Sequence, residues 1–307
     1  MPSVLITGGT GLVGTAVKAL LERKGYEVIL LSRSKSPIKG QAHWDIHAGI
    51  IDSSAIAAAD YIIHLAGAGV ADKRWSESRK QEILDSRTKS SALLVKALQE
   101  TPNKVKAVIS ASAIGWYGPD NKDVSTQGFV ETDPSYPDFL GTTCAAWEAS
   151  IAPVTANTNG LQKRLVCLRT GIVLSKNGGA LKEFLKPLAV RMAAVLGNGK
   201  QMISWIDCRD LAKMFVYALE NENISGSYNA VAPAPVSNKT LTQTLAKVLY
   251  GKFYFTTYVP SFVLKMMLGE MSIEVLKSTT VSSKKIIDAG FVFDYPEISK
   301  SLSTLDL

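Results

Sequence analysis

The chain has 307 residues, more than the roughly 100–200 of a typical single core, so one large domain or two interlocked domains are expected. Hydrophobic residues make up 46% of the sequence and charged residues 20%, a composition that excludes disordered and fibrous proteins. The net charge of +7 comes from scattered Lys and Arg without a basic block, which argues against a nucleic-acid partner.

The sequence shows no sign of a leader, a membrane span or a metal centre. The N-terminal MPSVLITGGTG lacks a basic segment followed by an apolar one, and no apolar run reaches the roughly 18 residues of a span. A cytoplasmic location without a membrane partner is therefore expected. His43 and His47 lie four residues apart without a helical pattern, so no metal site is expected there. Three cysteines without a CxxC pair argue against a disulfide framework: Cys144, Cys167 and Cys208.

The first two thirds of the chain alternate between strands and helices. A short β-branched run at 3–7 ends in GGTG and is followed by a helix with apolar residues three and four apart, closed by Gly25. The same reasoning predicts further strands at 28–31, 61–67, 106–112 and 164–174, and helices at 76–98 and 139–151. Since parallel neighbours need crossover connections, this order predicts an α/β fold, a Rossmann doubly wound parallel sheet.

The rhythm changes near residue 178. The pattern predicts a helix and a Gly-rich loop, a helix at 210–221 capped by Asp210, a strand at 227–233, and mostly helix from 236 to the end. We expect an NADP-binding Rossmann domain of residues 1–177 and 206–235. A smaller, mostly helical C-terminal substrate-side lobe would comprise 178–205 and 236–307.

The loop TGGTGLVG places Gly8, Gly11 and Gly14 between the first strand and the first helix. Glycines at this spacing allow a tight turn, close backbone approach to a pyrophosphate and close packing of helix on strand, while the helix N-terminus offers free N–H groups to the anion. A plain strand-to-helix connection is the alternative. The flanking strand and helix favour dinucleotide binding.

The second strand ends in Ser32 and Arg33 rather than in an acidic residue. An Asp or Glu there would pair with the adenosine ribose, whereas an Arg accommodates a 2′-phosphate, which favours NADP over NAD. The alternative for Arg33 is a solvated basic turn. His64, at the end of the third predicted strand, is interpreted as a core imidazole.

The motifs TGGTGLVG, HLAG and ISASAIGWYG resemble the extended short-chain dehydrogenase/reductase superfamily. The stretches RTGIVLSKNGGAL, LGNGKQMISWIDCRDL, NAVAP, VPSFVLKMMLGEM and AGFVFDYP then resemble, in order, its atypical YfcH-like branch, which is sugar-nucleotide epimerase-like and carries a DUF1731-type C-terminal domain. This resemblance covers nearly the whole chain. It implies that NADP(H) contacts fall on the following residues: Gly8, Thr10, Gly11, Leu12, Val13, Gly14, Ser32, Arg33, Leu65, Ala66, Glu82, Arg87 and Ile172. For Glu82 and Arg87, an exposed helix face is the alternative.

Most members of the superfamily use a Tyr four residues before a Lys as the acid/base pair. Here Leu140 and Cys144 stand in those places, and no YxxxK occurs in the chain. Ser112 matches the superfamily's substrate-binding hydroxyl. Tyr117 and Asp207 are the remaining candidates for proton transfer; Asp207 stands where the branch often has a histidine.

Two functions follow from these observations. The first is an NADP(H)-dependent oxidoreductase or epimerase with a non-standard active site, acting on a small molecule such as a sugar nucleotide or another carbonyl compound. The second is a non-catalytic NADP(H)-binding sensor. A homodimer is compatible with the sequence, which does not fix the oligomeric state.

Overall fold

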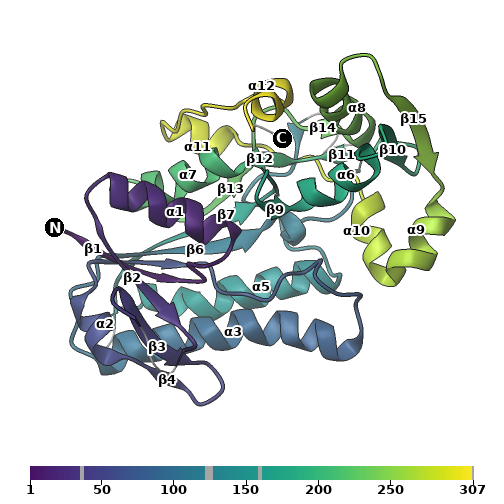
Figure 1. Ribbon diagram of the computed structural model, residues 1–307. Helices are drawn as coiled ribbons and strands as arrows, with labels where there is room; N and C mark the ends of the chain where they lie inside the picture. Colours follow the sequence, from purple (N-terminus) through teal and green to yellow (C-terminus); the bar gives the residue numbers. More distant parts are fainter. Residues whose placement is uncertain (35–37, 122–126, 158–160, 306–307) are drawn as a thin grey trace.

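The computed structural model describes residues 1–34, 38–121, 127–157 and 161–305 (Figure 1). Its centre is an eight-stranded sheet in the order β13-β7-β6-β5-β1-β2-β3-β4. All neighbours in it are parallel except β3 and β4. The bounds are β1 Ser3–Thr7, β2 Glu27–Ser32, β3 Gln41–Asp45, β4 Ile50–Ile51, β5 Tyr61–His64, β6 Ala107–Ala113, β7 Arg164–Thr170 and β13 Gly226–Ala230.

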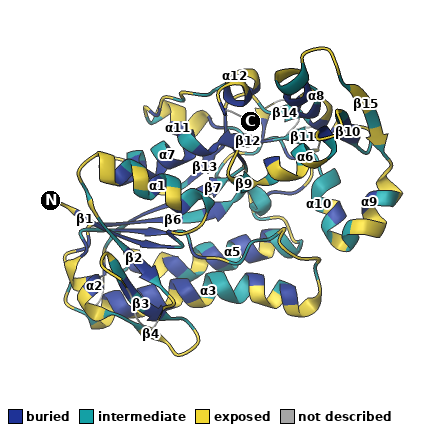
Figure 2. Ribbon diagram, in the orientation of Figure 1, coloured by how far each residue is buried: buried dark blue, intermediate teal, exposed yellow. Residues whose placement is uncertain are grey.

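Helices cover both faces of this sheet. On one face lie α1 (Leu12–Arg23) and α7 (Cys208–Glu220), and on the other lie α2 (Ser53–Ala58), α3 (Glu77–Glu100) and α5 (Phe139–Ile151) (Figure 1). Each face buries its own apolar cluster, and the dark strands and inward helix faces in Figure 2 mark both. The strand order reverses at β1, so the crevice of a doubly wound sheet falls at the carboxyl ends of β1 and β5.

Three small sheets and the remaining helices follow. The sheets are β12-β8-β9, β10-β15 and β11-β14, formed by β8 Ile172–Ser175, β9 Gly178–Gly179, β10 Met192–Leu196, β11 Met202–Ile203, β12 Trp205–Asp207, β14 Val236–Ser237 and β15 Phe255–Val259. The helices are α6 Ala180–Leu188, α8 Asn238–Tyr250, α9 Ser261–Leu268, α10 Ser272–Leu276, α11 Lys284–Asp288 and α12 Ile298–Ser303. Among the described residues, no helix combines the length and apolar character needed to cross a membrane.

Some predicted boundaries were wrong. The single strand predicted at 164–174 breaks at Gly171, where a side chain would meet the Ser204 carbonyl oxygen at 2.5 Å, and β8 leaves the large sheet to pair with β12. The helix predicted to start at Asp210 begins two residues earlier, because the Asp207 side chain accepts the Arg209 N–H as the N-cap. The C-terminal region also contains the strands β14 and β15.

The segment that follows α10 ties the small sheets to the large one. The Asp120 carboxylate accepts the Thr280 N–H at 2.7 Å and the hydroxyls of Ser278 and Thr280 at 2.8 Å each. One residue further on, Val281 forms a parallel bridge with Phe129. These contacts lie near the carboxyl end of the central strands and fix the position of the C-terminal residues there.

Candidate cofactor-binding site

In the glycine loop between β1 and α1, neighbouring backbone atoms occupy the places where side chains would otherwise be. Gly8 adopts φ +68°, and a Cβ on it would lie 2.8 Å from the Leu65 carbonyl oxygen. A Cβ on Gly14 would collide with the backbone of Gly8 and Gly9. No side chain caps α1 at Gly11, so the N–H groups of its first turn remain available to an anion. The loop therefore fits a pyrophosphate.

Thr7 and His64 fix the two strand ends beside this loop. The Thr7 hydroxyl oxygen accepts the N–H groups of Leu65 at 3.0 Å and Ala66 at 3.1 Å, so its one proton is donated to His64 Nδ1 at 2.7 Å. His64 Nε2 then carries the ring proton and faces the Ser91 hydroxyl at 3.1 Å. Burial lowers the pKa of His64 to about 3 and keeps the ring neutral. The prediction of a core imidazole is confirmed.

The end of β2 places Ser32 and Arg33 at the rim of the crevice. Arg33 is exposed, and the Ser32 hydroxyl accepts the Ser34 N–H at 3.2 Å. On the neighbouring strand, His43 pairs with Ser32 in register, and its Nδ1 lies 2.8 Å from the Ser34 carbonyl oxygen. His43 therefore anchors the turn that carries Arg33. The sequence patterns gave no signal for this role.

The turn after β5 is held by α3. The Ser86 hydroxyl accepts the Ala68 N–H at 2.9 Å, and Arg87 donates to the Ala68 carbonyl oxygen at 3.0 Å. Glu82 is 56% exposed and pairs at 2.7 Å with the buried Arg79. Arg79 in turn donates to the backbone of the same loop at Gly69. Arg87 thus lies beside the crevice, whereas Glu82 contacts another arginine; Arg79 was missed by sequence reasoning.

Leu140 and Cys144 lie on the first turns of α5 and face Gly115, the second residue after β6. A Cβ on Gly115 would lie 3.1 Å from Leu140 Cβ and 3.6 Å from Cys144 Sγ. Burial raises the pKa of Cys144 to about 12, so the thiol stays protonated and carries no charge. The two residues therefore form an apolar wall where the superfamily has its acid/base pair.

Ser112 and Tyr117 belong to a packed polar network. The Ser112 hydroxyl donates to Glu148 at 2.6 Å, and Glu148 forms a two-pronged ion pair with Arg169 at 2.9 and 3.0 Å. The Tyr117 hydroxyl accepts from Arg169 at 3.0 Å and donates to Asn229 at 2.7 Å.

Solvent does not reach the two hydroxyl-bearing residues of this network. Ser112 is 2% exposed and Tyr117 is 0% exposed. Burial also raises the pKa of Tyr117 to about 12. Both side chains have protein partners, and the expected roles of Ser112 in orienting a substrate and of Tyr117 as an acid stay predictions.

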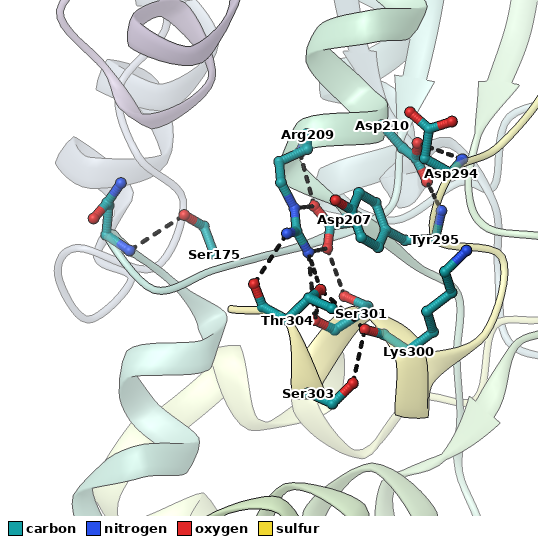
Figure 3. A network of polar contacts seen from close by, with 11 residues as sticks. Ser175, Asp207, Arg209, Asp210, Asp294, Tyr295, Lys300, Ser301, Ser303 and Thr304 are labelled. Carbon is teal, nitrogen blue, oxygen red and sulfur yellow. Dashed lines mark hydrogen bonds and ion pairs between the residues drawn. The ribbon is translucent and has the colours of Figure 1, made fainter. Parts of the chain in front are cut away.

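Asp207 is part of a second structural network (Figure 3). It is 0% exposed, and its carboxylate pairs with Arg209 at 2.7 Å and accepts the Ser301 hydroxyl at 2.7 Å. The Arg209 guanidinium also lies over the Tyr295 ring, 3.6 Å from its centroid. Asp207 therefore caps α7 and joins that helix to α12, and its expected role in proton transfer stays a prediction.

Charged side chains of the C-terminal region reach the start of α5. Lys277 is 8% exposed; its Nζ lies 2.8 Å from Glu274 and 3.5 Å from Asp138, the N-cap of α5. Burial raises the pKa of Glu274. Ile172, 39% exposed, begins β8 directly after the end of β7. Apart from Ile172, none of these residues was recognised in the sequence, where Asp138 lies far from Glu274 and Lys277.

The glycine loop, the strand order and the exposed Arg33 at the rim of the crevice together define a dinucleotide-binding protein of the short-chain dehydrogenase/reductase type. Residues 4–230 match the NAD dependent epimerase/dehydratase family, and residues 259–305 match a domain of unknown function, DUF1731. The chain therefore belongs to the NAD dependent epimerase/dehydratase family, as the resemblance predicted.

Relatives match over almost the full length. The mouse epimerase family protein SDR39U1 is 34% identical, covering 97% of this chain and 98% of its own length. The Bacillus subtilis epimerase family protein YfhF is 33% identical, covering 99% and 97%. A crystal structure of human SDR39U1 with NADPH superimposes with a TM-score of 0.86 at 30% identity, over 99% of this chain and 98% of that one.

Proposed function

We propose that the chain binds NADP(H) in the crevice at the carboxyl ends of β1 and β5. The observation that carries the proposal is the glycine loop: side chains at Gly8 and Gly14 would collide with neighbouring backbone, so glycines are needed for the tight turn that brings backbone close to a pyrophosphate. The N-terminus of α1, which follows this turn, has no side-chain cap, so its N–H groups are available to the anion. The human relative named above was crystallised with NADPH, which supports the same ligand here.

Arg33 supports NADP(H) over NAD(H). Its guanidinium is exposed at the end of β2, where a 2′-phosphate on the adenosine ribose would lie, and no acidic side chain occupies that position. Arg87, whose guanidinium lies beside Gly67 at the turn after β5, is proposed to contact the same cofactor. Ile172 and the backbone of Leu65 and Ala66 complete the proposed contacts.

The chemistry that we propose is that of an oxidoreductase or epimerase acting on a small molecule, with sugar nucleotides as the first class to test. When bound, NADP(H) would supply or accept a hydride. The chain's own residues must then move a proton, and Glu274 is proposed for this step. The pKa of its carboxyl is raised. The carboxylate pairs with Lys277, which also contacts the N-cap of α5, and the first turn of this helix is where the superfamily has its tyrosine.

The second candidate is a non-catalytic NADP(H)-binding protein. The apolar wall of Leu140 and Cys144 and the structural engagement of Ser112 and Tyr117 favour it. The enzyme would be favoured if the wild-type chain turns over a carbonyl compound and Glu274→Gln loses this turnover while its NADPH affinity is unchanged. Turnover unchanged by Glu274→Gln would remove that residue from the mechanism.

Calorimetric titration with NADPH and NADH tests the binding proposal directly. We expect the wild-type chain to prefer NADPH and Arg33→Asp to lose about tenfold or more in NADPH affinity, with a much smaller effect on NADH. An unchanged preference in the variant would exclude Arg33 from the 2′-phosphate site. If neither nucleotide binds, the proposed function is wrong.

A further inference from the structure

The C-terminal lobe exposes large apolar side chains in one short stretch. Between residues 248 and 273, eight of them are 39% to 77% exposed: Val248, Phe253, Phe255, Tyr258, Phe262, Met266, Met267 and Ile273. The stretch holds every exposed phenylalanine of the described chain. Single exposed apolar residues are normal, but so many in 26 consecutive positions mark an interaction surface. We call these eight residues the lobe patch.

Consecutive elements carry the lobe patch. It begins at the end of α8, continues through the edge strand β15 and reaches α9 and α10, along the side of the lobe away from the N-terminus in Figure 1. Phe262 and Met266 lie one helical turn apart on α9 and are each 70% exposed, whereas Leu264 is 6% exposed and packs inward. The helix therefore turns apolar side chains to solvent on the face where polar ones are usual.

The charges around the lobe patch are mostly positive. Between Glu222 and Glu270 the sequence has no acidic residue, and its four lysines are all exposed: Lys239, Lys247, Lys252 and Lys265. Lys252 precedes Phe253, and Lys265 precedes Met266. The surface thus combines exposed aromatic and methionine side chains with flanking ammonium groups, and the one carboxylate within the stretch, that of Glu270, pairs with Lys80 at 2.6 Å. It is complementary to an anionic partner that also accepts apolar side chains.

We propose that the lobe patch docks on the surface of an anionic lipid bilayer. Phe262 and Met266 would enter the boundary between headgroups and acyl chains, and the lysines would contact anionic headgroups. A second copy of the chain fits less well, because the lysines of one copy would face those of the other across a two-fold axis. Nucleic acid fits less well because Met266 and Met267 offer no stacking surface. The proposal departs from the expectation of no membrane partner, which considered only spanning segments.

Sedimentation of the full chain with vesicles tests the proposal. We expect binding to vesicles of phosphatidylcholine mixed with phosphatidylglycerol, weakening as salt is added, and none to phosphatidylcholine alone. The double variant Phe262→Ser, Met266→Ser should bind at least about tenfold more weakly. Lys252→Glu and Lys265→Glu should each cost about fivefold or more.

Two controls and a stability check keep the result interpretable. Val292→Ser removes another 70% exposed apolar side chain, outside the lobe patch, and Lys106→Glu reverses an exposed lysine of the large sheet region; both should bind vesicles like the wild type. All variants should melt near the wild-type temperature. Equal binding to neutral vesicles, or no loss in the lobe-patch variants, would overturn the proposal. Two other results would also overturn the proposal if vesicles remain unbound. One is a dimer, seen by light scattering, that the lobe-patch variants abolish, and the other is binding to a short DNA duplex that the same variants abolish.

Discussion

The Thr7 hydroxyl donates its proton to His64 Nδ1 at 2.7 Å, because two backbone N–H groups already occupy its acceptor side. Together with these two bonds and the strand pairing, this contact joins the ends of β1 and β5, the two strands that border the proposed cofactor crevice. It also fixes the tautomer of a fully buried imidazole. The fold therefore depends on a histidine that must remain neutral.

The neutral state of His64 predicts acid sensitivity. In the unfolded chain the imidazole takes up a proton as the pH falls through 6.5, whereas in the folded chain burial lowers its pKa to about 3. The stability present above pH 6.5 is therefore lost as the pH falls towards 3, at up to about 1.4 kcal/mol per pH unit from this site. Urea unfolding at a series of pH values should show this slope in the wild type and a shallower one in His64→Asn. Parallel slopes in the two proteins would contradict it.

Close backbone approach at Gly8 predicts a double defect in Gly8→Ala. The added methyl group would meet the Leu65 carbonyl oxygen at 2.8 Å, so both stability and NADPH affinity should fall. Gly49→Ala is the matched control, because Gly49 has the same φ of +68° with nothing within 4 Å. It should cost about 1–2 kcal/mol for the left-handed backbone alone and leave NADPH affinity intact. Equal losses in denaturant unfolding and calorimetry would refute a steric role for Gly8.

The network around Tyr117 predicts a stability effect without a cofactor effect. Tyr117→Phe leaves Asn229 and Arg169 each without one partner in a buried place, which should lower the free energy of unfolding by about 1–3 kcal/mol. NADPH affinity should not change. If the variant instead unfolds like the wild type while turnover disappears, Tyr117 is a catalytic group after all.

The contact between His43 and Ser34 predicts a change in nucleotide preference. Removing the ring in His43→Ala frees the turn that carries Arg33, so the NADPH-to-NADH affinity ratio should fall several-fold. His43→Gln, whose amide can still donate to the Ser34 carbonyl oxygen, should restore most of it. His47→Ala, four positions past the stretch of β3 that pairs with β2, is the control and should leave the ratio unchanged. A ratio that is unaltered in His43→Ala would remove the anchoring role.

Sequence patterns predicted the fold well where they were local. The glycine loop, the β-branched runs and the apolar spacing of α1 each specify their own structure within a few residues. The boundary at Gly171 and the cap at Asp207 were missed because contacts with Ser204 and α12 decide them, and those residues lie far away in the chain.

The proposed site was predictable only on its cofactor side. The glycine loop has a sequence signature, whereas the hydrogen-bond partner of a hydroxyl does not. The motif around Ser112 gives no sign that its hydroxyl donates a hydrogen bond to Glu148. Long-range partners of this kind explain why the contacts of Tyr117 and Asp207 could not be predicted from sequence patterns, and why Arg79 and Lys277 were overlooked.

The hydrogen bonds of Asp120 with Ser278 and Thr280 restrict how a ligand could enter and leave the crevice. Hinge closure, as in proteins with two lobes joined by a simple linker, would have to break the three hydrogen bonds from Ser278 and Thr280 and the Phe129–Val281 bridge together. A rigid-body movement of the C-terminal region away from the large sheet is therefore unfavourable in free energy. We therefore expect a ligand to exchange through rearrangement of loops around the crevice, while the strands that form its walls stay in place.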